Sequence, residues 1–226
     1  MMQHTISPEK WQAALVAGAG KVGLDLSFGQ LEQFRVYMEE LERWNRSYNL
    51  TRIIEPLEIV RGHFLDSLNY HPFLGDADRV LDIGSGPGFP GLPLALVRPE
   101  SRFFLCEARQ KKVLFLEFIR RRLGLENVSI IHLHLSRQNA KKAGLEPFPA
   151  IVCRAVNVLR DVVPVAAELL AERGFLLFSD AAPDRLRVTE ELRQRNLGLV
   201  LEYIEPCPLE GRARKLYMGR IGRSGN

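Results

Sequence analysis

The stretch that decides the fold of this 226-residue chain is Val80-Leu81-Asp82-Ile83-Gly84-Ser85-Gly86-Pro87-Gly88-Phe89-Pro90-Gly91. A short apolar run ends in an acid, alternating glycines follow it, and an expected helix begins directly afterwards. A strand, a glycine-rich turn and a helix N-terminus in this order form the nucleotide-binding corner of an open α/β sheet. Glycine adopts positive φ and lets the backbone approach a ligand closely, because no Cβ intervenes. The stretch therefore predicts a ligand site at the end of this strand.

Around this turn, short apolar runs alternate with helical stretches along the chain. The expected strands are Arg79–Ile83, Phe103–Cys106, Val128–Leu133, Ala150–Cys153, Phe175–Ser179, Val200–Ile204 and Lys215–Met218. The expected helices are Phe89–Val97, Gln110–Leu123, Asp161–Ala171 and Arg185–Arg195. Apolar runs bounded by turns are typical of buried parallel strands. The repeated strand–helix units predict a doubly wound, Rossmann-like α/β sheet of about seven strands over residues 76–226.

Residues 1–75 have a helical pattern instead, and we expect them to form a cap packed on the α/β domain. Ser27 is an expected helix N-cap, and Pro56 begins another helix. Residues 43–51 are expected to be irregular, because they contain two asparagines, which are poor helix formers. His63 and Asp66 are three residues apart and could face one another, and a hydrogen-bonded packing pair is favoured over a functional pair.

The composition is ordinary for a soluble globular protein, with 46% apolar and 26% charged residues. No apolar run approaches the roughly 20 residues of a membrane span, and the first residues lack the features of a signal peptide. We therefore expect a cytoplasmic protein without a membrane partner, and a monomer is favoured. Cys106, Cys153 and Cys207 are far apart and form no Cys-x-x-Cys pair, which argues against disulfides and a metal site.

The charged residues are distributed unevenly. The net charge is +4, but residues 1–80 carry 8 basic and 11 acidic side chains, whereas residues 81–226 carry 23 and 16. The chain after Glu210 has five basic residues and no acid. This asymmetry agrees with a polyanionic partner, although an ordinary basic surface explains it equally well.

The glycine spacing distinguishes two kinds of nucleotide ligand. A dinucleotide site requires Gly-x-Gly-x-x-Gly, whereas Phe89 occupies the position of the third glycine here. Phe89 and Pro90 would crowd a pyrophosphate at the helix N-terminus. Asp82 instead offers a carboxylate for the ammonium group of a ligand. Glu107, 23 positions after Gly84, is placed to accept hydrogen bonds from both ribose hydroxyls. The residues therefore favour an amino-acid-bearing nucleoside, S-adenosylmethionine.

Four motifs occur in order along the chain. They are Trp44-Asn45-x-x-x-Asn49-Leu50-Thr51, His63-Phe64-x-Asp66-Ser67-Leu68, the stretch from Asp82 to Gly91, and Arg154-Ala155. Together they resemble the RsmG (glucose-inhibited division protein B) family of bacterial small-subunit rRNA methyltransferases, over roughly residues 30–180. The resemblance implies a class I S-adenosylmethionine-dependent methyltransferase fold. It also implies methyl transfer to N7 of a guanine in 16S rRNA, with naked rRNA and the 30S particle both open as substrates.

The resemblance also implies which residues bind. Cofactor contacts are expected from Gly84, Gly86 and Phe89 in the turn, from Glu107, Ala108 and Arg109 along the ribose and adenine, and from Leu135 and Ser136 at the adenine. Arg154 would border both cofactor and substrate and position them.

The chain departs from the family pattern at two places. Leu135-Ser136 stands where the family commonly has a small residue followed by Glu, and Ser179-Asp180 stands where it often has Lys-Gly. An acidic contact to adenine and a basic contact to RNA are therefore missing or supplied elsewhere.

Methylation of N7 fits a site without a catalytic acid or base, because N7 of neutral guanine has a free lone pair. The protein need only align the nucleophile, methyl group and sulfur, and stabilise the charge that moves to guanine. In agreement, the chain lacks the Asp/Asn-Pro-Pro-aromatic motif of exocyclic-amine methyltransferases. Pro206-Cys207 lies past the fifth expected strand rather than after the fourth, so Cys207 is disfavoured as the nucleophile of a C5 methyltransferase.

RNA contacts are expected from a basic rim. The candidates are Arg109, Lys111, Lys112, Arg120, Arg121, Arg122, Lys141, Lys142 and the tail from Arg212, and the three consecutive arginines fit a solvated helix face better. Phosphate contacts would supply salt-dependent affinity, and an extruded guanine would be read in the pocket. Two other classes stay open: a nicotinamide-dependent oxidoreductase, which shares the βαβ corner, and a non-catalytic RNA- or cofactor-sensing module.

Overall fold

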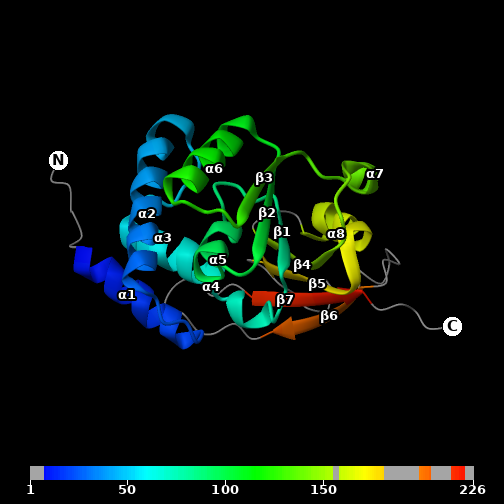
Figure 1. Ribbon diagram of the computed structural model, residues 1–226, viewed down its shortest axis with the longest axis horizontal. Helices are drawn as coiled ribbons and strands as arrows, with labels where there is room; N and C mark the ends of the chain where they lie inside the picture. The colour runs from blue at the N-terminus through cyan, green and yellow to red at the C-terminus, as the bar shows by residue number, and fades with distance from the viewer. Residues whose placement is uncertain (1–7, 155–157, 181–198, 205–214, 222–226) are drawn as a thin grey trace.

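A sheet of seven strands, in the order β3-β2-β1-β4-β5-β7-β6, forms the centre of the computed structural model (Figure 1). The structure describes residues 8–154, 158–180, 199–204 and 215–221. The strands are β1 (Arg79–Ile83), β2 (Arg102–Glu107), β3 (Val128–His132), β4 (Phe148–Arg154), β5 (Leu170–Asp180), β6 (Leu199–Ile204) and β7 (Lys215–Ile221). Neighbours from β3 to β5 are parallel, and β7 is antiparallel to both β5 and β6. The predicted doubly wound α/β class is confirmed.

The helices lie before and between these strands. They are α1 (Pro8–Lys21), α2 (Phe28–Tyr48), α3 (Pro56–Ile59), α4 (Asp66–Leu68), α5 (Gly91–Val97), α6 (Gln110–Arg122), α7 (Arg137–Ala140) and α8 (Val163–Leu169). Residues 60–65 and 158–162 are π-helical, and residues 71–73 and 141–143 form 3₁₀ turns. No described helix is long and apolar enough to cross a membrane.

Three helix predictions differ from the structure in their bounds, and one falls outside it; α6 differs least, since it ends at Arg122 rather than Leu123. Helix α5 begins at Gly91 rather than Phe89, because Pro90 is its N-cap residue. The helix expected over residues 161–171 is a π-helical turn followed by α8, and strand β5 already begins at Leu170. The helix expected over residues 185–195 lies outside the described residues.

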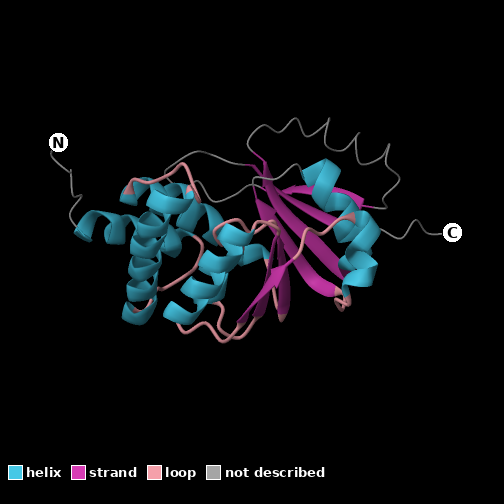
Figure 2. Cartoon of the chain, turned by 90° about the horizontal axis from the view of Figure 1, so that it is seen from above, coloured by secondary structure: helices cyan, strands magenta, loops and turns pink. Residues whose placement is uncertain are grey.

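Both faces of the sheet are covered, because successive residues of a strand point to opposite sides and both sides are apolar. Val80 belongs to a core shared with α1, α2, α5 and α6. Its neighbour Leu81 belongs to a second core shared with α7 and α8. Figure 2 shows the helices on the two sides of the strands. The N-terminal helices thus share a core with one face of the sheet, and α2 packs on α5 and α6. The division of the chain at residue 75 stays a prediction.

The predicted irregular stretch over residues 43–51 is wrong for residues 43–48, because α2 continues to Tyr48, and it is confirmed for residues 49–51. Ser27 caps this helix as predicted, in a capping box with Gln30. Asn45 does not end the helix, because its side-chain Oδ1 accepts a hydrogen bond from the backbone N–H of Thr51 (2.8 Å). Asn49 ends it instead, in the left-handed conformation with φ 49°. The asparagines therefore shape the turn after α2 and place Thr51.

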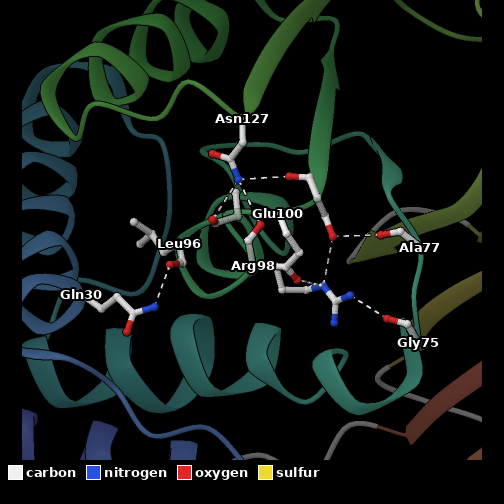
Figure 3. A network of polar contacts seen from close by, with 9 residues as sticks. Gln30, Gly75, Ala77, Leu96, Arg98, Glu100 and Asn127 are labelled. Atoms are coloured by element: carbon white, nitrogen blue, oxygen red, sulfur yellow. Dashed lines mark hydrogen bonds and ion pairs between the residues drawn. The ribbon is translucent and has the colours of Figure 1, made fainter.

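A polar network fixes the C-terminal end of α5, the end that lies away from the glycine turn (Figure 3). The side-chain amide of Asn127 donates to the carbonyls of Ala95, Arg98 and Ser101, at 3.1, 3.2 and 3.1 Å. Gln30 of α2 donates to the carbonyl of Leu96 over 3.0 Å. The bonds to Ala95 and Leu96 satisfy carbonyls that the end of α5 leaves without partners, and the bond from Gln30 ties α5 to α2.

Candidate active site

A cavity of about 550 Å³ lies at the carboxyl ends of the central strands, where the sequence predicts the ligand site. Open α/β sheets bind their ligands at this edge, and the volume lies in the range of small-molecule sites. Eight of the ten predicted site residues line the cavity, namely Gly84, Gly86, Phe89, Glu107, Ala108, Arg109, Leu135 and Arg154. The N-terminal segment contributes the opposite part of the lining, with Leu50, Thr51, Arg52 and His63.

The glycine turn after β1 requires glycine for two different reasons. Gly84, Gly86 and Gly88 all have positive φ, at 72°, 61° and 114°. A Cβ at Gly88 would lie 2.4 Å from Leu92 Cδ1 and 2.6 Å from Tyr37 Oη, so packing excludes it. A Cβ at Gly86 would meet only Lys112 Nζ at 3.6 Å and a backbone oxygen at 4.0 Å, on the cavity side. The absence of a side chain at Gly86 therefore leaves space in the cavity for a ligand, whereas at Gly88 it leaves space for the side chains of Leu92 and Tyr37.

Glu107, the last residue of β2, is fixed beside this turn. Its Oε2 accepts from the backbone N–H of Gly86 over 2.9 Å, and its Oε1 accepts from that of Arg109 over 2.8 Å. A carboxylate has about four acceptor positions, so both oxygens keep capacity for a further donor. The predicted ribose-binding acid is thus present, held at the cavity wall in one orientation.

Asp82 does not line the cavity, in contrast to the expectation that it faces the ligand's ammonium group. The residue is fully buried, and its Oδ2 accepts from the backbone N–H of Gly91 over 2.9 Å. Its Oδ1 has no hydrogen-bond partner among the described residues. Burial raises the pKa of this carboxyl to about 7, against the opposing effects of the Gly91 hydrogen bond and of Arg154. In this structure Asp82 supports the turn from beneath.

Ser136 also lies outside this cavity and lines a smaller one of about 400 Å³ that shares His134 and Leu135 with it. It is the N-cap of α7, in a capping box with Asn139. The residue at the position where the family commonly has Glu therefore begins the helix, and its backbone N–H donates to Asn139 Oδ1 over 2.8 Å. Ser179, the other departure, is only 3% exposed and offers no surface for an RNA contact.

Arg154, at the end of β4, joins the two sides of the cavity. Its Nη1 donates to Asp66 Oδ2 over 2.7 Å, and its Nη2 lies 2.8 Å from His63 Nδ1. The guanidinium carbon lies 5.0 Å from the centre of the Phe89 ring, and the His63 ring stacks on the same ring at 4.3 Å. The sequence interpretation of His63 and Asp66 as a packing pair missed that both meet Arg154, which lies about 90 residues away in the chain.

Thr51, Arg52 and Lys112 are among the cavity residues that were not predicted as cofactor contacts. Thr51 occurs in the quoted Asn-Leu-Thr motif, and Arg52 follows it. Lys112 was expected only on the RNA rim, but it lines the cavity. Burial lowers the pKa of Lys112, and the charge of Glu107 opposes this effect. The motif was therefore a usable signal for Thr51, whereas only the fold places Lys112 above the glycine turn.

Several residues of the predicted basic rim have protein partners. Lys111 donates to the carbonyl of Tyr48 over 2.7 Å, and Lys141 lies 2.9 Å from a carboxylate oxygen of Glu168. Arg120 lies 3.4 Å from Glu117 on the same helix. Residues 212–214 and 222–226 lie outside the described part of the chain, so most of the predicted basic tail is not placed. Arg52 and Arg109 are exposed at the cavity.

Cys106 is another cavity residue whose chemistry is constrained. Its thiol lies 3.1 Å from the carbonyl of Leu133 and is almost fully buried. Burial, with Asp82 and Glu107 nearby, raises its pKa to about 12. The thiolate is the nucleophilic form of cysteine, so Cys106 is unsuited to attack a substrate. Among the described residues, no group of three or more potential ligands is arranged to hold a metal ion.

Comparisons with known proteins agree with this architecture. The GidB family model, described as rRNA small subunit methyltransferase G, matches residues 30–204. The "Ribosomal RNA small subunit methyltransferase G" of Geobacter metallireducens is 34% identical over 216 residues, 93% of this chain and 96% of its own. The protein of the same name from Ectopseudomonas mendocina is 40% identical over 148 residues, 65% of this chain and 67% of its own.

A solved structure supports the fold at a greater evolutionary distance. A SAM-dependent O-methyltransferase from Thermotoga maritima has a TM-score of 0.57 at 16% identity, over 84% of this chain and 72% of that one. The family match covers the glycine turn, Glu107 and Arg154 together, and it excludes the alternative of a nicotinamide-dependent oxidoreductase. The chain belongs to the GidB family, rRNA small subunit methyltransferase G.

Proposed function

We propose that this chain transfers a methyl group to N7 of a guanine in 16S rRNA. As a GidB family member it is an S-adenosylmethionine-dependent methyltransferase of small-subunit rRNA; the proposal specifies the nucleotide atom and the RNA molecule. S-adenosylmethionine, when bound, supplies an electrophilic methyl group on sulfur. The observation that carries the proposal is that three reactive side chains near the glycine turn are held by hydrogen bonds or in a protonated form, so that none acts as a base or nucleophile.

These three side chains are Glu107, His63 and Cys106. Glu107 accepts two backbone hydrogen bonds, and the Nδ1 lone pair of His63 faces an arginine, which can only donate. Cys106 has a raised pKa and stays a thiol. None of the three is set to remove a proton from a substrate amine or to attack a base carbon. Guanine N7 needs neither step, since its lone pair is free in the neutral base, so an in-line transfer without a general base fits this cavity.

For the cofactor, we propose contacts along one side of the cavity. Gly84, Gly86 and Phe89 would contact it at the turn, Glu107 would accept from the ribose, and Ala108, Arg109 and Leu135 would lie along the ribose and adenine. The fit rests on the open approach at Gly86 and on the free acceptor capacity of Glu107. Lys112 adds a cation above the turn, where it could pair with a ligand carboxylate. Arg154 would hold Phe89 and His63 at the border between cofactor and substrate.

For the RNA, we propose that Arg52 and Arg109 flank the entrance. Both are exposed, and both border the cavity. Phosphate contacts of this kind make affinity fall with salt concentration. The N-terminal cap, residues 1–75, would then form one wall of the site and residues 76–226 the cofactor-binding domain. A monomer acting in the cytoplasm on the 30S particle or on naked 16S rRNA is consistent with this arrangement.

A labelling experiment tests the function. Undermethylated 30S subunits and naked 16S rRNA are each incubated with the protein and S-adenosylmethionine that carries an isotopic label in the methyl group, and the RNA is digested and analysed by mass spectrometry. We expect labelled 7-methylguanosine. Label in any other nucleoside contradicts the proposal, and absence of transfer despite cofactor binding favours the sensing module.

The cofactor contacts are tested by isothermal titration with S-adenosylhomocysteine. Glu107→Gln replaces one acceptor oxygen by an NH₂ group that cannot accept from a backbone N–H, so the affinity should fall about ten-fold or more. Glu126→Gln is the matched control, because Glu126 is exposed and lies outside the cavity. Equal affinities of the two variants contradict the assignment of Glu107.

A further inference from the structure

The hydroxyl of Thr51 stands on the cavity wall in a defined hydrogen-bonding state. Thr51 follows α2 and lines the cavity together with His63 and Arg154. Its Oγ1 lies 2.9 Å from His63 Nε2 and accepts from the backbone N–H of Ile53 over 3.1 Å. Its own backbone N–H donates to Asn45, which holds the residue in place.

The direction of each hydrogen bond follows from Arg154. A guanidinium has only donors, so the Nδ1 of His63, at 2.8 Å from Arg154 Nη2, must be the accepting nitrogen. The proton of the neutral imidazole is therefore on Nε2, which donates to Thr51 Oγ1. Asp66 fixes the guanidinium at 2.7 Å and keeps it directed at the histidine. A series of hydrogen bonds thus runs from Asp66 through Arg154 and His63 to Thr51, and the donor and acceptor of each bond are fixed.

The Thr51 hydroxyl consequently has only its proton left to offer. A hydroxyl has two acceptor positions and one donor. Both acceptor positions are used, one by His63 and one by Ile53. A substrate group that meets this hydroxyl must therefore be an acceptor, and a second donor would be left without a partner, at a cost in binding.

We infer that Thr51 reads the target base by donating a hydrogen bond to O6 of guanine, and that His63 and Arg154 act as positioning residues that set its polarity. The inference rests on the proposed transfer to N7. Guanine carries the acceptors N7 and O6 on the same edge, whereas adenine carries N7 and an amino donor there. A hydroxyl that can only donate accepts guanine at this edge and rejects adenine.

A cycle of paired changes in protein and RNA tests the contact. Thr51→Val removes the hydroxyl at nearly constant shape, and 2-aminopurine, placed at the methylated position by RNA ligation, removes O6 and keeps N7. With the unmodified guanine, Thr51→Val should lower kcat/KM about ten-fold. The 2-aminopurine substitution should lower kcat/KM of the wild type by a factor about ten-fold larger than it lowers kcat/KM of Thr51→Val, because that variant already lacks the contact to O6. Thr51→Ser keeps the donor and should show the wild-type sensitivity to 2-aminopurine.

Each outcome decides the inference. Equal sensitivity of the wild type and Thr51→Val to 2-aminopurine overturns it, and so does a loss of S-adenosylhomocysteine affinity that matches the loss of activity. Thr51→Ala serves as a second variant with the same expected coupling, and melting temperatures establish that each variant folds. If the wild type forms no 7-methylguanosine on the unmodified RNA, the proposed function has failed rather than the role of Thr51.

The donor and acceptor roles in this series of hydrogen bonds can be measured without any substrate. Nitrogen-15 NMR of the histidine side chains, assigned through loss of one signal set in His63→Gln, should show a protonated Nε2 and an unprotonated Nδ1 for His63. A proton on Nδ1 contradicts the arrangement and, with it, the donor role of Thr51.

Discussion

Arg154 and Asp66 form a buried ion pair, with 2.7 Å between Nη1 and Oδ2 and side chains that are 5% and 10% exposed. The pair links the end of β4 to α4 at the wall of the cavity. Because each charge is removed from water, each depends on the other for its solvation. The same guanidinium that orients His63 and Phe89 therefore also holds the N-terminal helices on the sheet.

Arg154→Ala should lower methyl transfer and stability together. Arg154 is a predicted site residue, and its loss also leaves the buried Asp66 carboxylate behind, at a cost of about 3 kcal/mol in the free energy of unfolding. Misplaced Phe89 and His63 should reduce kcat about a hundred-fold. Urea unfolding and single-turnover assays measure the two effects. In the double variant Asp66→Ala/Arg154→Ala the loss of stability should be smaller than the sum of the losses in the two single variants. Full activity of Arg154→Ala would contradict the assignment of Arg154 as a positioning residue of the site.

Tyr37→Phe tests how α2 supports the glycine turn. The buried Tyr37 hydroxyl donates to the carbonyl of Pro87 over 2.8 Å. Removal of this donor leaves a buried carbonyl without that partner, so the free energy of unfolding should fall by about 1–2 kcal/mol. The affinity for S-adenosylhomocysteine should fall as well, because Pro87 stands between Gly86 and Gly88. Exposed Tyr48→Phe on the same helix is the control. Unchanged affinity in Tyr37→Phe shows that the turn holds its shape without α2.

Gly86→Ala separates backbone strain from ligand contact. Gly86 has φ 61° and Gly124 has φ 66°, so alanine at either position pays a similar strain, about 1 kcal/mol. A Cβ at Gly124 meets nothing within 4 Å, whereas Gly86 lines the cavity. Both variants should lose similar stability, but only Gly86→Ala should lose cofactor affinity, by about ten-fold or more. Comparable affinities of the two variants would show that the ligand does not approach the turn at Gly86.

Asp82→Asn should remove a pH dependence of stability. Burial raises the pKa of Asp82 to about 7 in the folded protein, above its ordinary value of 3.8. Between these two values the folded state retains a proton that the unfolded state has lost, so wild-type stability falls as the pH rises from about 4 to about 7. Asparagine keeps an acceptor for Gly91 and has no charge to bury.

The measurement for Asp82 is the free energy of unfolding of cofactor-free protein at pH 5 and pH 8. From pH 5 to pH 8, the free energy of unfolding of Asp82→Asn should rise relative to that of the wild type by on the order of 2 kcal/mol. The comparison of differences cancels the titration of all other groups. A constant difference means that Asp82 ionises normally in the folded protein.

The sheet and the position of the site could be predicted from sequence because local patterns determine them. The run Arg79–Ile83 matches β1 residue for residue, since an apolar run that ends in glycines has few alternatives. Glu107 could be placed near the glycines because parallel neighbouring strands end at the same edge. These inferences need only the chain near each residue and the general rules of α/β folds.

The orientation of side chains in the site could not be predicted, because it depends on individual hydrogen-bond partners, some of which are distant in the chain. Asp82 turns away from the cavity toward Gly91, nine residues on, at the start of α5. His63 and Asp66 meet Arg154 across 91 and 88 residues. Asn45 continues a helix that its propensity disfavours, because its amide is used by Thr51 in the next turn. In each case the orientation follows from a specific hydrogen-bond partner that the local apolar and glycine pattern does not identify.

The proposed function depends on where the cofactor binds, and a crystal structure of the protein with S-adenosylhomocysteine would locate it. We expect the ligand in the cavity of about 550 Å³, with a ribose hydroxyl within about 3.2 Å of Glu107 and the amino-acid part of the ligand passing Gly86. Arg154 should keep its contacts with Asp66 and His63 in the complex. A ligand bound in the smaller cavity beside Ser136, or a ribose without contact to Glu107, would contradict the account.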